Sequence, residues 1–244
     1  MTNQEKISYA KEKIAAHRGL PADIFDSDKN VFLERLDCFF ELIHFDRNAV
    51  IFVDKAILDW CVETFAHVPG SEIMKGEHFN RLAAKLREFG REIPDDYKDI
   101  QFLHLKKGKD LQKYDEFKFE IYEKDRLAGL YKDYGEEKFP YVFDEEYSEE
   151  MLAIAALKGD EIVALVSCDN DHTGAFRMIS VDTLAEYRGR GLATHLVAKI
   201  ALETESRGQV PLYVTWGTNT ASVRTALAAG FSPVGLWCFT DDAD

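Results

Sequence analysis

The segment Arg188-Gly189-Arg190-Gly191-Leu192-Ala193 carries the most specific signal in this chain of 244 residues. It follows an apolar, strand-like run over 176–184 and leads into a helical pattern of apolar residues that starts at Leu192. The first N–H groups of a helix have no acceptor inside the helix, and the macrodipole places partial positive charge there. Gly191 lets a ligand approach the backbone closely, and Gly189 allows an unusual φ angle. The segment therefore predicts a site for a phosphate or pyrophosphate.

Three kinds of phosphate-binding loop compete for this segment. A P-loop needs G-x-x-x-x-G-K-[ST], and that string is absent from the sequence. The dinucleotide fingerprint G-x-G-x-x-G fails because Thr194 stands in place of the last glycine, and because the segment lies too near the C-terminus. The third pattern, R-x-x-G-x-A, is present as Arg188, Gly191 and Ala193. An ordinary strand-to-helix turn with two solvated arginines is the alternative to all three.

The residues downstream favour the third pattern. A β-rich run over 210–216 is followed by Asn219, a helical stretch to Ala229, and the pair Gly230-Phe231, which is typical of a helix C-cap. This order resembles the core of the GNAT (N-acetyltransferase) superfamily. In that family the loop is Q/R-x-x-G-x-G/A, N-x-x-[SA] follows the fifth strand, and G-F ends the next helix. The resemblance covers roughly residues 112–244 and is closest to a two-part group of bacterial acetyltransferases.

The resemblance implies the fold class and the domains. The expected class is α/β (mixed α+β), with a GNAT-like mixed, mostly antiparallel sheet flanked by helices and a smaller N-terminal α/β unit. The expected domains are 1–110, which shapes the substrate side in related bacterial proteins, and 111–244, which binds acetyl-CoA. The polar stretch 106–110 is the predicted linker. Periodicity also predicts helices over 31–45 and 148–157.

The resemblance further implies acetyl-CoA as cosubstrate. In the family the fourth and fifth strands splay, and the pantetheine arm pairs with the open edge, which maps to Asp182, Thr183 and Leu184. Asn219 matches the side chain that grips the arm, and Ser222 is a nearby contact, although Asn219 also fits a simple helix cap. The pyrophosphate is expected on the loop and the start of the helix, namely Arg188, Gly189, Arg190, Gly191, Leu192, Ala193 and Thr194.

The catalytic groups are less well defined. An ammonium must lose a proton before it attacks, and the leaving thiolate must gain one. Many GNAT proteins carry a tyrosine seven residues after the asparagine, but here that position is Ala226. Tyr213 and Cys238 are the candidate substitutes as general acid, and an unassisted thiolate is also chemically tolerable. Asp182 is the candidate general base, with a structural strand-end role as the alternative.

These observations predict an acetyl-CoA-dependent N-acetyltransferase. It would transfer the acetyl group directly, in a ternary complex, to the amine of a small, cationic substrate. The missing tyrosine keeps open a non-catalytic acyl-CoA-binding or sensor module on the same fold. A different acyl donor or an oxygen acceptor is the third hypothesis.

Composition limits the classes of molecule that we expect the protein to bind. With 44 acidic and 30 basic side chains the net charge is −14, which argues against nucleic acid and favours a cationic amine. We therefore expect an acceptor pocket between the two units with at least one carboxylate. The four cysteines are scattered and no zinc or other metal motif occurs, so no metal is expected. The sequence shows no membrane span and no secretory signal, which predicts a cytoplasmic protein, and it leaves the oligomeric state open.

Overall fold

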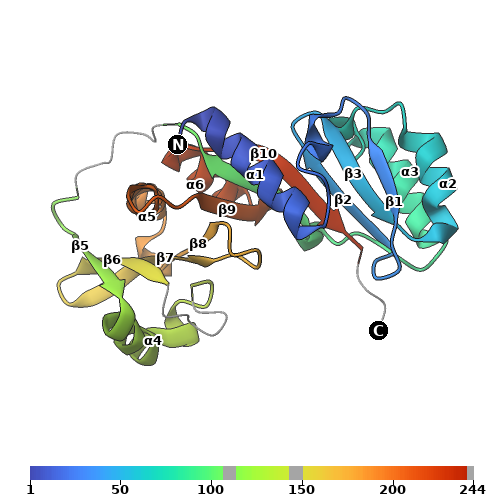
Figure 1. Cartoon of the computed structure of the whole chain (residues 1–244). Helices are drawn as coiled ribbons and strands as arrows, with labels where there is room; N and C mark the ends of the chain where they lie inside the picture. Colours follow the sequence, from blue (N-terminus) through green and yellow to red (C-terminus); the bar gives the residue numbers. More distant parts are fainter. Residues whose placement is uncertain (107–113, 143–150, 241–244) are drawn as a thin grey trace. The chain divides into compact units, whose positions relative to one another are not determined.

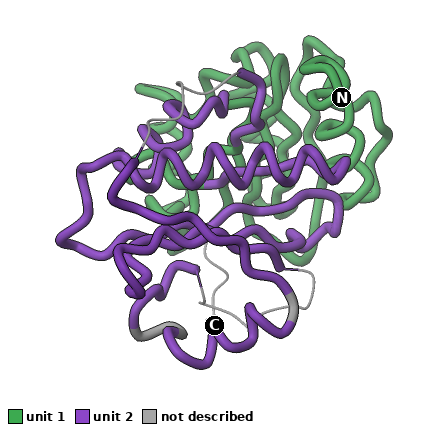
Figure 2. The backbone as a smooth tube through the Cα atoms, turned by 90° about the vertical axis from the view of Figure 1, so that its left-hand side faces the viewer, with its two compact units in different colours: residues 1–101, 215–219, 233–244 green, residues 102–214, 220–232 purple. Residues whose placement is uncertain are grey.

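The computed structural model describes residues 1–106, 114–142 and 151–240. The chain divides into two compact units, coloured separately in Figure 2. Unit 1 consists of Met1–Gln101, Thr215–Asn219 and Pro233–Asp244, and unit 2 of Phe102–Val214 and Thr220–Ser232. Two strands, β4 (Lys98–His104) and β10 (Phe231–Phe239), contribute residues to both units.

Unit 1 contains a mixed sheet. Strand β3 (Asn48–Val53) pairs in parallel with β1 (Val31–Glu34) and antiparallel with β2 (Phe40–Phe45), and β2 pairs antiparallel with β10. Helices α2 (Lys55–Phe65) and α3 (Gly76–Arg87) cover one face of this sheet (Figure 1). The unit also holds α1 and three short 3-10 turns, namely α1 (Asn3–His17), η1 (Ile24–Asp26), η2 (Gly70–Glu72) and η3 (Asp95–Tyr97).

The core of unit 1 lies between the sheet and these two helices. Alternate residues of the strands, such as Leu42 and Ile51, are fully buried and belong to one cluster with Ile57, Phe65 and Leu82 of the helices. The spacing of two on the strands and of about four on α2 is the amphipathic pattern of each element. The core thereby fixes which face of each strand points toward the helices.

The predicted helix over 31–45 is wrong. Residues 31–34 and 40–45 form β1 and β2, which lie on the two sides of β3. Aromatic and β-branched residues such as Val31, Phe40 and Ile43 suit a pleated surface, and β3 supplies hydrogen-bond partners to both strands. Pairing with a strand that comes later in the chain therefore overrides the local helical periodicity.

Unit 2 contains a largely antiparallel sheet in the order β9-β8-β7-β6-β5. Its strands are β5 (Lys118–Glu123), β6 (Leu152–Lys158), β7 (Glu161–Asn170), β8 (Arg177–Thr183) and β9 (Pro211–Trp216). Helix α5 (Leu192–Ser206) contacts β6, β7 and β8 and lies beside α6 (Thr220–Ala229). Leu127 and Leu130 of α4 (Lys124–Lys138) belong to one buried cluster with residues of β6 and β7, such as Ala153 and Leu165.

The predicted helix over 148–157 is also wrong where the structure describes it. Residues 152–157 lie in β6, and residues 143–150 are outside the described part of the chain. The alanines of this run favour a helix in isolation. In the fold, β6 pairs with β5 on one side and β7 on the other, and residues 152–157 are buried, so strand pairing and burial override that preference.

The predicted fold class is confirmed: the chain is a mixed α/β protein whose strand pairs are mostly antiparallel. The predicted boundary between residues 110 and 111, and most of the predicted linker, lie outside the described residues. The compact units differ from the predicted domains because unit 1 includes C-terminal residues of β10 that pair with β2. Among the described helices, none is both long and apolar enough to cross a membrane.

Candidate active site

The segment 188–193 forms the turn between β8 and α5, after the short 3-10 turn η4 (Ala185–Tyr187). Gly189 and Gly191 both adopt positive φ angles, of 75° and 81°. Gly191 is the N-cap of α5, and no side chain caps the helix in the described structure. The N–H groups of residues 192–194 therefore have no acceptor within the helix, which is the arrangement that binds an anion.

Tyr114 lies against this turn and was not predicted. Its hydroxyl donates a hydrogen bond of 2.9 Å to the carbonyl oxygen of Arg190. A Cβ atom added to Gly191 would lie 2.9 Å from the same hydroxyl. The backbone at Gly191 thus combines a left-handed conformation with a close neighbour, and both conditions require glycine. No sequence motif marks Tyr114, because it precedes β5 and meets the turn only in the folded chain.

The side chains of Arg188 and Asp182 both hydrogen-bond to the backbone of Thr183. The Arg188 Nε donates to the Thr183 carbonyl oxygen at 2.9 Å, and the Thr183 N–H donates to Asp182 Oδ1 at 2.8 Å. Arg188 Nη2 lies 3.7 Å from the same Asp182 oxygen. Burial raises the pKa of Asp182, whose side chain is 9% exposed, although Thr183 and Arg188 act in the opposite direction. The structure thus brings together three of the predicted site residues.

Strands β8 and β9 separate shortly after they begin. The ladder between them joins only Arg177 with Pro211 and Met178 with Leu212 among the described pairs. On the other side of β8 the N–H of Leu184 donates to Val163, so the N–H of Leu184 is already used. These two strands therefore leave part of the β8 edge unpaired with β9.

The open edge of β8 presents the backbone of Val181. The N–H of Arg177 points toward β9, where it donates to the Val210 carbonyl at 2.9 Å. Hydrogen-bonding directions alternate along a strand, so the N–H of Val181 points the same way. Thr183 shares this direction, but its N–H and carbonyl are taken by Asp182 and Arg188.

Tyr213 on β9 is buried and hydrogen-bonded to α6. Its hydroxyl lies 2.9 Å from Ser222 Oγ, in the first turn of α6. Burial raises the pKa of Tyr213, although the hydrogen bond to Ser222 lowers it. Ala226 is completely buried, so the usual tyrosine would not fit there without repacking. Cys238 is also completely buried, in the core of unit 1, and cannot reach a reactant as a general acid.

Asn219 lies in the turn between β9 and α6. Its N–H donates to the carbonyl of Trp216 at 3.1 Å, which closes the turn. The residue immediately precedes α6, so the turn places it where a helix cap is expected. The backbone contact fixes the position of Asn219 at the start of α6.

His195, in the first turn of α5, is the second site residue that was not predicted. Its side chain is buried, and neither ring nitrogen has a hydrogen-bond partner among the described residues. The ring packs on Phe119 and meets the edge of Tyr114, with centroid distances of 4.5 and 5.1 Å. Burial, assisted by the charge of Lys199, lowers the pKa of His195 to about 4. The residue is therefore a neutral imidazole at neutral pH.

We expect His195 to make folding stability depend on pH. Its folded pKa of about 4 lies below the ordinary value of 6.5, so its stabilising effect is complete above pH 6.5 and is lost as the pH falls toward 4. Relative to a His195→Phe variant, the wild-type chain should lose about 3 kcal/mol of unfolding free energy between pH 7 and pH 4. Urea unfolding at several pH values measures this difference. Parallel profiles for the two proteins would contradict it.

A family model describes most of this chain. The model of the GNAT acetyltransferases matches residues 63–237. The chain belongs to the GNAT acetyltransferase family. In this GNAT protein the match begins inside α2, well before residue 112, so the family pattern includes α3 and β4. Residues 63–110 of the expected N-terminal domain therefore belong to the family pattern, and residues 1–62 lie outside the match.

Solved GNAT structures are similar to this GNAT protein at low identity. A GCN5-related N-acetyltransferase-like protein from Streptococcus suis is 17% identical over 67% of this chain and 68% of its own, with a TM-score of 0.46. A GCN5-related N-acetyltransferase from Kribbella flavida is 15% identical over 67% and 64%, with a TM-score of 0.48. A tandem GNAT protein from the clavulanic acid biosynthesis pathway is 13% identical over 70% and 61%, with a TM-score of 0.43. The comparison with curated proteins finds no match.

Proposed function

We propose that this GNAT protein is an acetyl-CoA-dependent N-acetyltransferase that acts on the amine of a small molecule. The observation that carries the proposal is the combination, in unit 2, of an uncapped α5 N-terminus with an open β8 edge. The first feature suits a pyrophosphate and the second suits an extended arm that bears amide groups. When bound, acetyl-CoA supplies an activated acyl group as a thioester.

The residues of the turn have distinct roles in the proposal. The N–H groups of residues 192–194 hold the pyrophosphate, and Gly189 and Gly191 let it approach the backbone. The N–H of Val181, at the open edge, is the donor for the arm or for the thioester carbonyl, where negative charge develops. Arg188 holds the end of this edge in place through the Thr183 carbonyl.

Asp182 is the proposed general base. A base works best when its pKa lies near the operating pH, and burial moves the pKa of Asp182 in that direction. Its carboxylate accepts the backbone N–H groups of Thr183 and Tyr141, which hold it in place, and it takes a proton from the ammonium of the acceptor.

We expect the main role of Arg188 to be holding the end of β8 in place, with only a minor direct contribution to binding acetyl-CoA. Arg188→Ala should weaken acetyl-CoA binding by about threefold to tenfold, because the backbone amides do most of the holding and the lost bond to Thr183 is worth roughly 1 kcal/mol. Calorimetric titration measures the change. Arg190→Ala is the matched comparison, since Arg190 contacts the Glu186 carbonyl at 3.4 Å and not β8. An equal loss in both variants would contradict the positioning role.

Tyr213 is the proposed proton donor to the leaving thiolate, with Ser222 as its hydrogen-bonded partner. Tyr213→Phe should lower kcat about tenfold to 100-fold with little change in acetyl-CoA affinity, as expected for loss of a general acid. Ser222→Ala should lower it less, because the phenol remains. Steady-state kinetics and the pH profile of kcat measure both effects. An unchanged kcat in Tyr213→Phe would favour an unassisted thiolate.

A non-catalytic acyl-CoA-binding module is the second candidate, because a buried alanine, Ala226, stands where many GNAT proteins carry a tyrosine. One experiment separates it from the enzyme. Titration with acetyl-CoA establishes binding, and a thiol-release assay over a panel of small amines then tests transfer. An enzyme and a binding module would both bind acetyl-CoA, but only an enzyme would release free thiol faster when an amine is present. Intersecting initial-velocity lines are expected for direct transfer in a ternary complex.

The cationic character of the acceptor and the pocket between the units stay predictions, and a salt-dependent KM for the amine tests them.

A further inference from the structure

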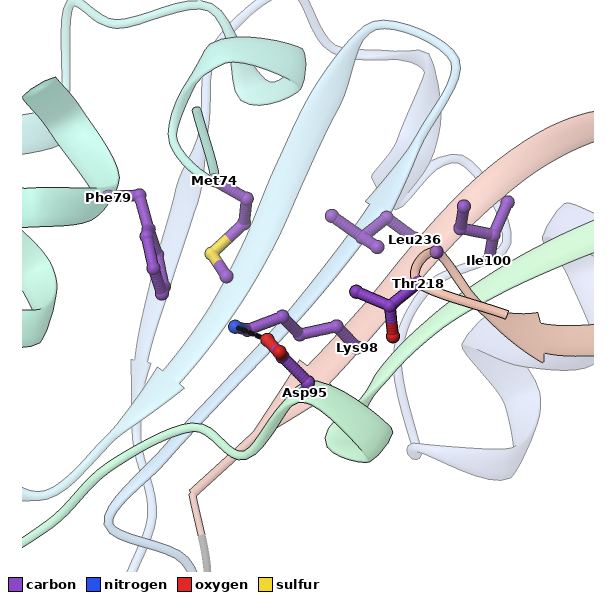
Figure 3. Close-up of a pocket in the computed structure, with 8 residues that line it drawn as sticks. Met74, Phe79, Asp95, Lys98, Ile100, Thr218 and Leu236 are labelled. Carbon is purple, nitrogen blue, oxygen red and sulfur yellow. Dashed lines mark hydrogen bonds and ion pairs between the residues drawn. The ribbon is translucent and has the colours of Figure 1, made fainter. Parts of the chain in front are cut away.

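Unit 1 contains a pocket whose lysine is already paired. Apolar side chains such as Phe79 and Leu236 supply much of the lining, and Lys98 Nζ lies 2.7 Å from Asp95 Oδ1 (Figure 3). Both partners of this ion pair line the same pocket, so the lysine does not call for an anion. Buried polar atoms without a partner lie instead in unit 2, beside the turn between β8 and α5.

His195 supplies these unpaired atoms. Its side chain lies in the first turn of α5 and the residue is 8% exposed, yet neither ring nitrogen has a partner among the described residues. Buried polar groups in folded proteins nearly always have a hydrogen-bond partner. The ring meets that of Tyr114, whose hydroxyl reaches the turn at Arg190. The unpaired imidazole is therefore a second sign, besides the uncapped helix, that a polar ligand completes this part of unit 2.

The Tyr114 hydroxyl sets the direction of one peptide group in the turn. It donates to the Arg190 carbonyl oxygen at 2.9 Å. A trans peptide is planar, so its C=O and N–H groups point in opposite directions. The bond to Tyr114 therefore turns the Gly191 N–H away from the phenol, and this N–H donates to no backbone carbonyl among the described residues.

The Gly191 N–H adds a donor to those at the start of α5. Gly191 has a φ of 81° and a ψ of 7°, and the right-handed helix begins at the next residue. Successive N–H groups in such a sequence of conformations point into one concavity that suits an anion. A flip of the Arg190–Gly191 peptide, which the freedom of glycine permits, would place a carbonyl oxygen there and repel a phosphate. The hydrogen bond from Tyr114 opposes this flip.

The phenol is itself held by its neighbours. The centroid of the Tyr114 ring lies 5.9 Å from that of Phe117, 6.1 Å from that of Phe119 and 5.1 Å from that of His195. The rings of Phe119 and His195 pack on each other at 4.5 Å. Aromatic pairs at these separations stabilise a structure beyond the area that they bury. Tyr114 is therefore a fixed support for the turn.

We propose that Tyr114 is a positioning residue for the pyrophosphate of the acyl donor. It holds the Arg190–Gly191 peptide with its N–H toward the anion, so the turn favours thioesters that carry a pyrophosphate over thioesters that lack one. Tyr114 acts through the backbone and not on the acetyl group, so it governs the KM for acetyl-CoA and not kcat. The identity of the donor rests on the proposed function, whereas the affinity of the turn for an anion is measured without turnover.

Tyr114→Phe removes the hydroxyl and keeps the ring contacts. In calorimetric titration of the full chain, the variant should bind acetyl-CoA about fivefold to tenfold more weakly, as expected for the loss of one hydrogen bond. Inorganic pyrophosphate should lose affinity by the same factor. Tyr122→Phe is the matched control, because Tyr122 lies on β5 and its hydroxyl donates to Glu120 Oε2 at 3.3 Å instead of to the turn. It should leave both affinities unchanged.

Acetyl-pantetheine provides a second comparison, since it has the thioester and the arm but no phosphate. In Tyr114→Phe the KM for acetyl-CoA should rise by the same factor as the dissociation constant, with kcat unchanged. The kcat/KM for acetyl-pantetheine should stay at the wild-type value. A merely structural role of Tyr114 would lower turnover with both donors.

The possible outcomes separate this inference from the proposed function. Equal losses with the two donors, an equal loss in Tyr122→Phe, or unchanged acetyl-CoA affinity in Tyr114→Phe would overturn the inference. Tighter binding by Tyr114→Phe would also overturn it, because the phenol would then obstruct the turn. Weaker binding of acetyl-CoA and pyrophosphate by Tyr114→Phe, without thiol release from any amine by the wild type, would support the positioning role and contradict the proposed function. A wild-type chain that binds neither ligand would contradict both.

Discussion

Gly191→Glu should weaken acetyl-CoA binding at least 100-fold, which corresponds to roughly 2.7 kcal/mol. The substitution places bulk and negative charge where the pyrophosphate must approach the N-terminus of α5. It also forces a side chain onto a φ of 81° and places its Cβ atom 2.9 Å from the Tyr114 hydroxyl. Calorimetric titration with acetyl-CoA measures the loss.

Gly208→Glu is the matched control for this variant. Gly208 follows the opposite end of α5 and has a similar φ of 76°, but a Cβ atom added there meets nothing within 4 Å. It carries the same backbone strain, of about 1 kcal/mol, without touching the turn. Acetyl-CoA affinity should therefore survive in Gly208→Glu. If a folded Gly191→Glu protein bound acetyl-CoA as tightly as the wild type, the assignment of the cofactor site would be wrong.

Gly70→Ala should lower the unfolding free energy by about 3 kcal/mol or more, which is at the upper end for overpacked cores. Gly70 is buried at the start of η2. A Cβ atom there would lie 2.6 Å from two backbone atoms at the start of β3, Ala49 N and Asn48 C. Backbone atoms within a sheet cannot move aside as a flexible side chain can, so η2 must separate from the strand.

The separation would also strain a hydrogen-bonded junction. Asn30 Oδ1 accepts the Ala49 N–H at 2.9 Å, and its amide nitrogen donates to the carbonyls of Phe65 and Val68. Gly129→Ala is the contrasting control, because Gly129 lies in α4 with nothing near its Cβ position, and alanine there should stabilise by about 0.5–1 kcal/mol. Urea unfolding measures both changes. A Gly70→Ala protein as stable as wild type would contradict the packing of η2 on β3.

The sequence alone determined the turn at 188–193 and the order of elements around it. A strand followed by glycines with positive φ and an apolar helix is a local pattern, because each signal depends on residues within one turn of the chain. The same holds for Asn219 before α6 and for Gly230 after it. The family and the fold class follow from these local signals in their order.

The tertiary structure decided what depends on contacts between distant residues. Residues 31–45 are strands because β3 pairs with them on both sides, although their own spacing suits a helix. Tyr114 meets the carbonyl of Arg190, which lies 76 positions later, and no local pattern marks that contact. The hydrogen bond between Tyr213 and Ser222 likewise requires α6 to fold back beside β9. Local propensity fixes the conformation of a turn, but burial and pairing partners, which come from elsewhere in the chain, fix strands and the neighbours of a site.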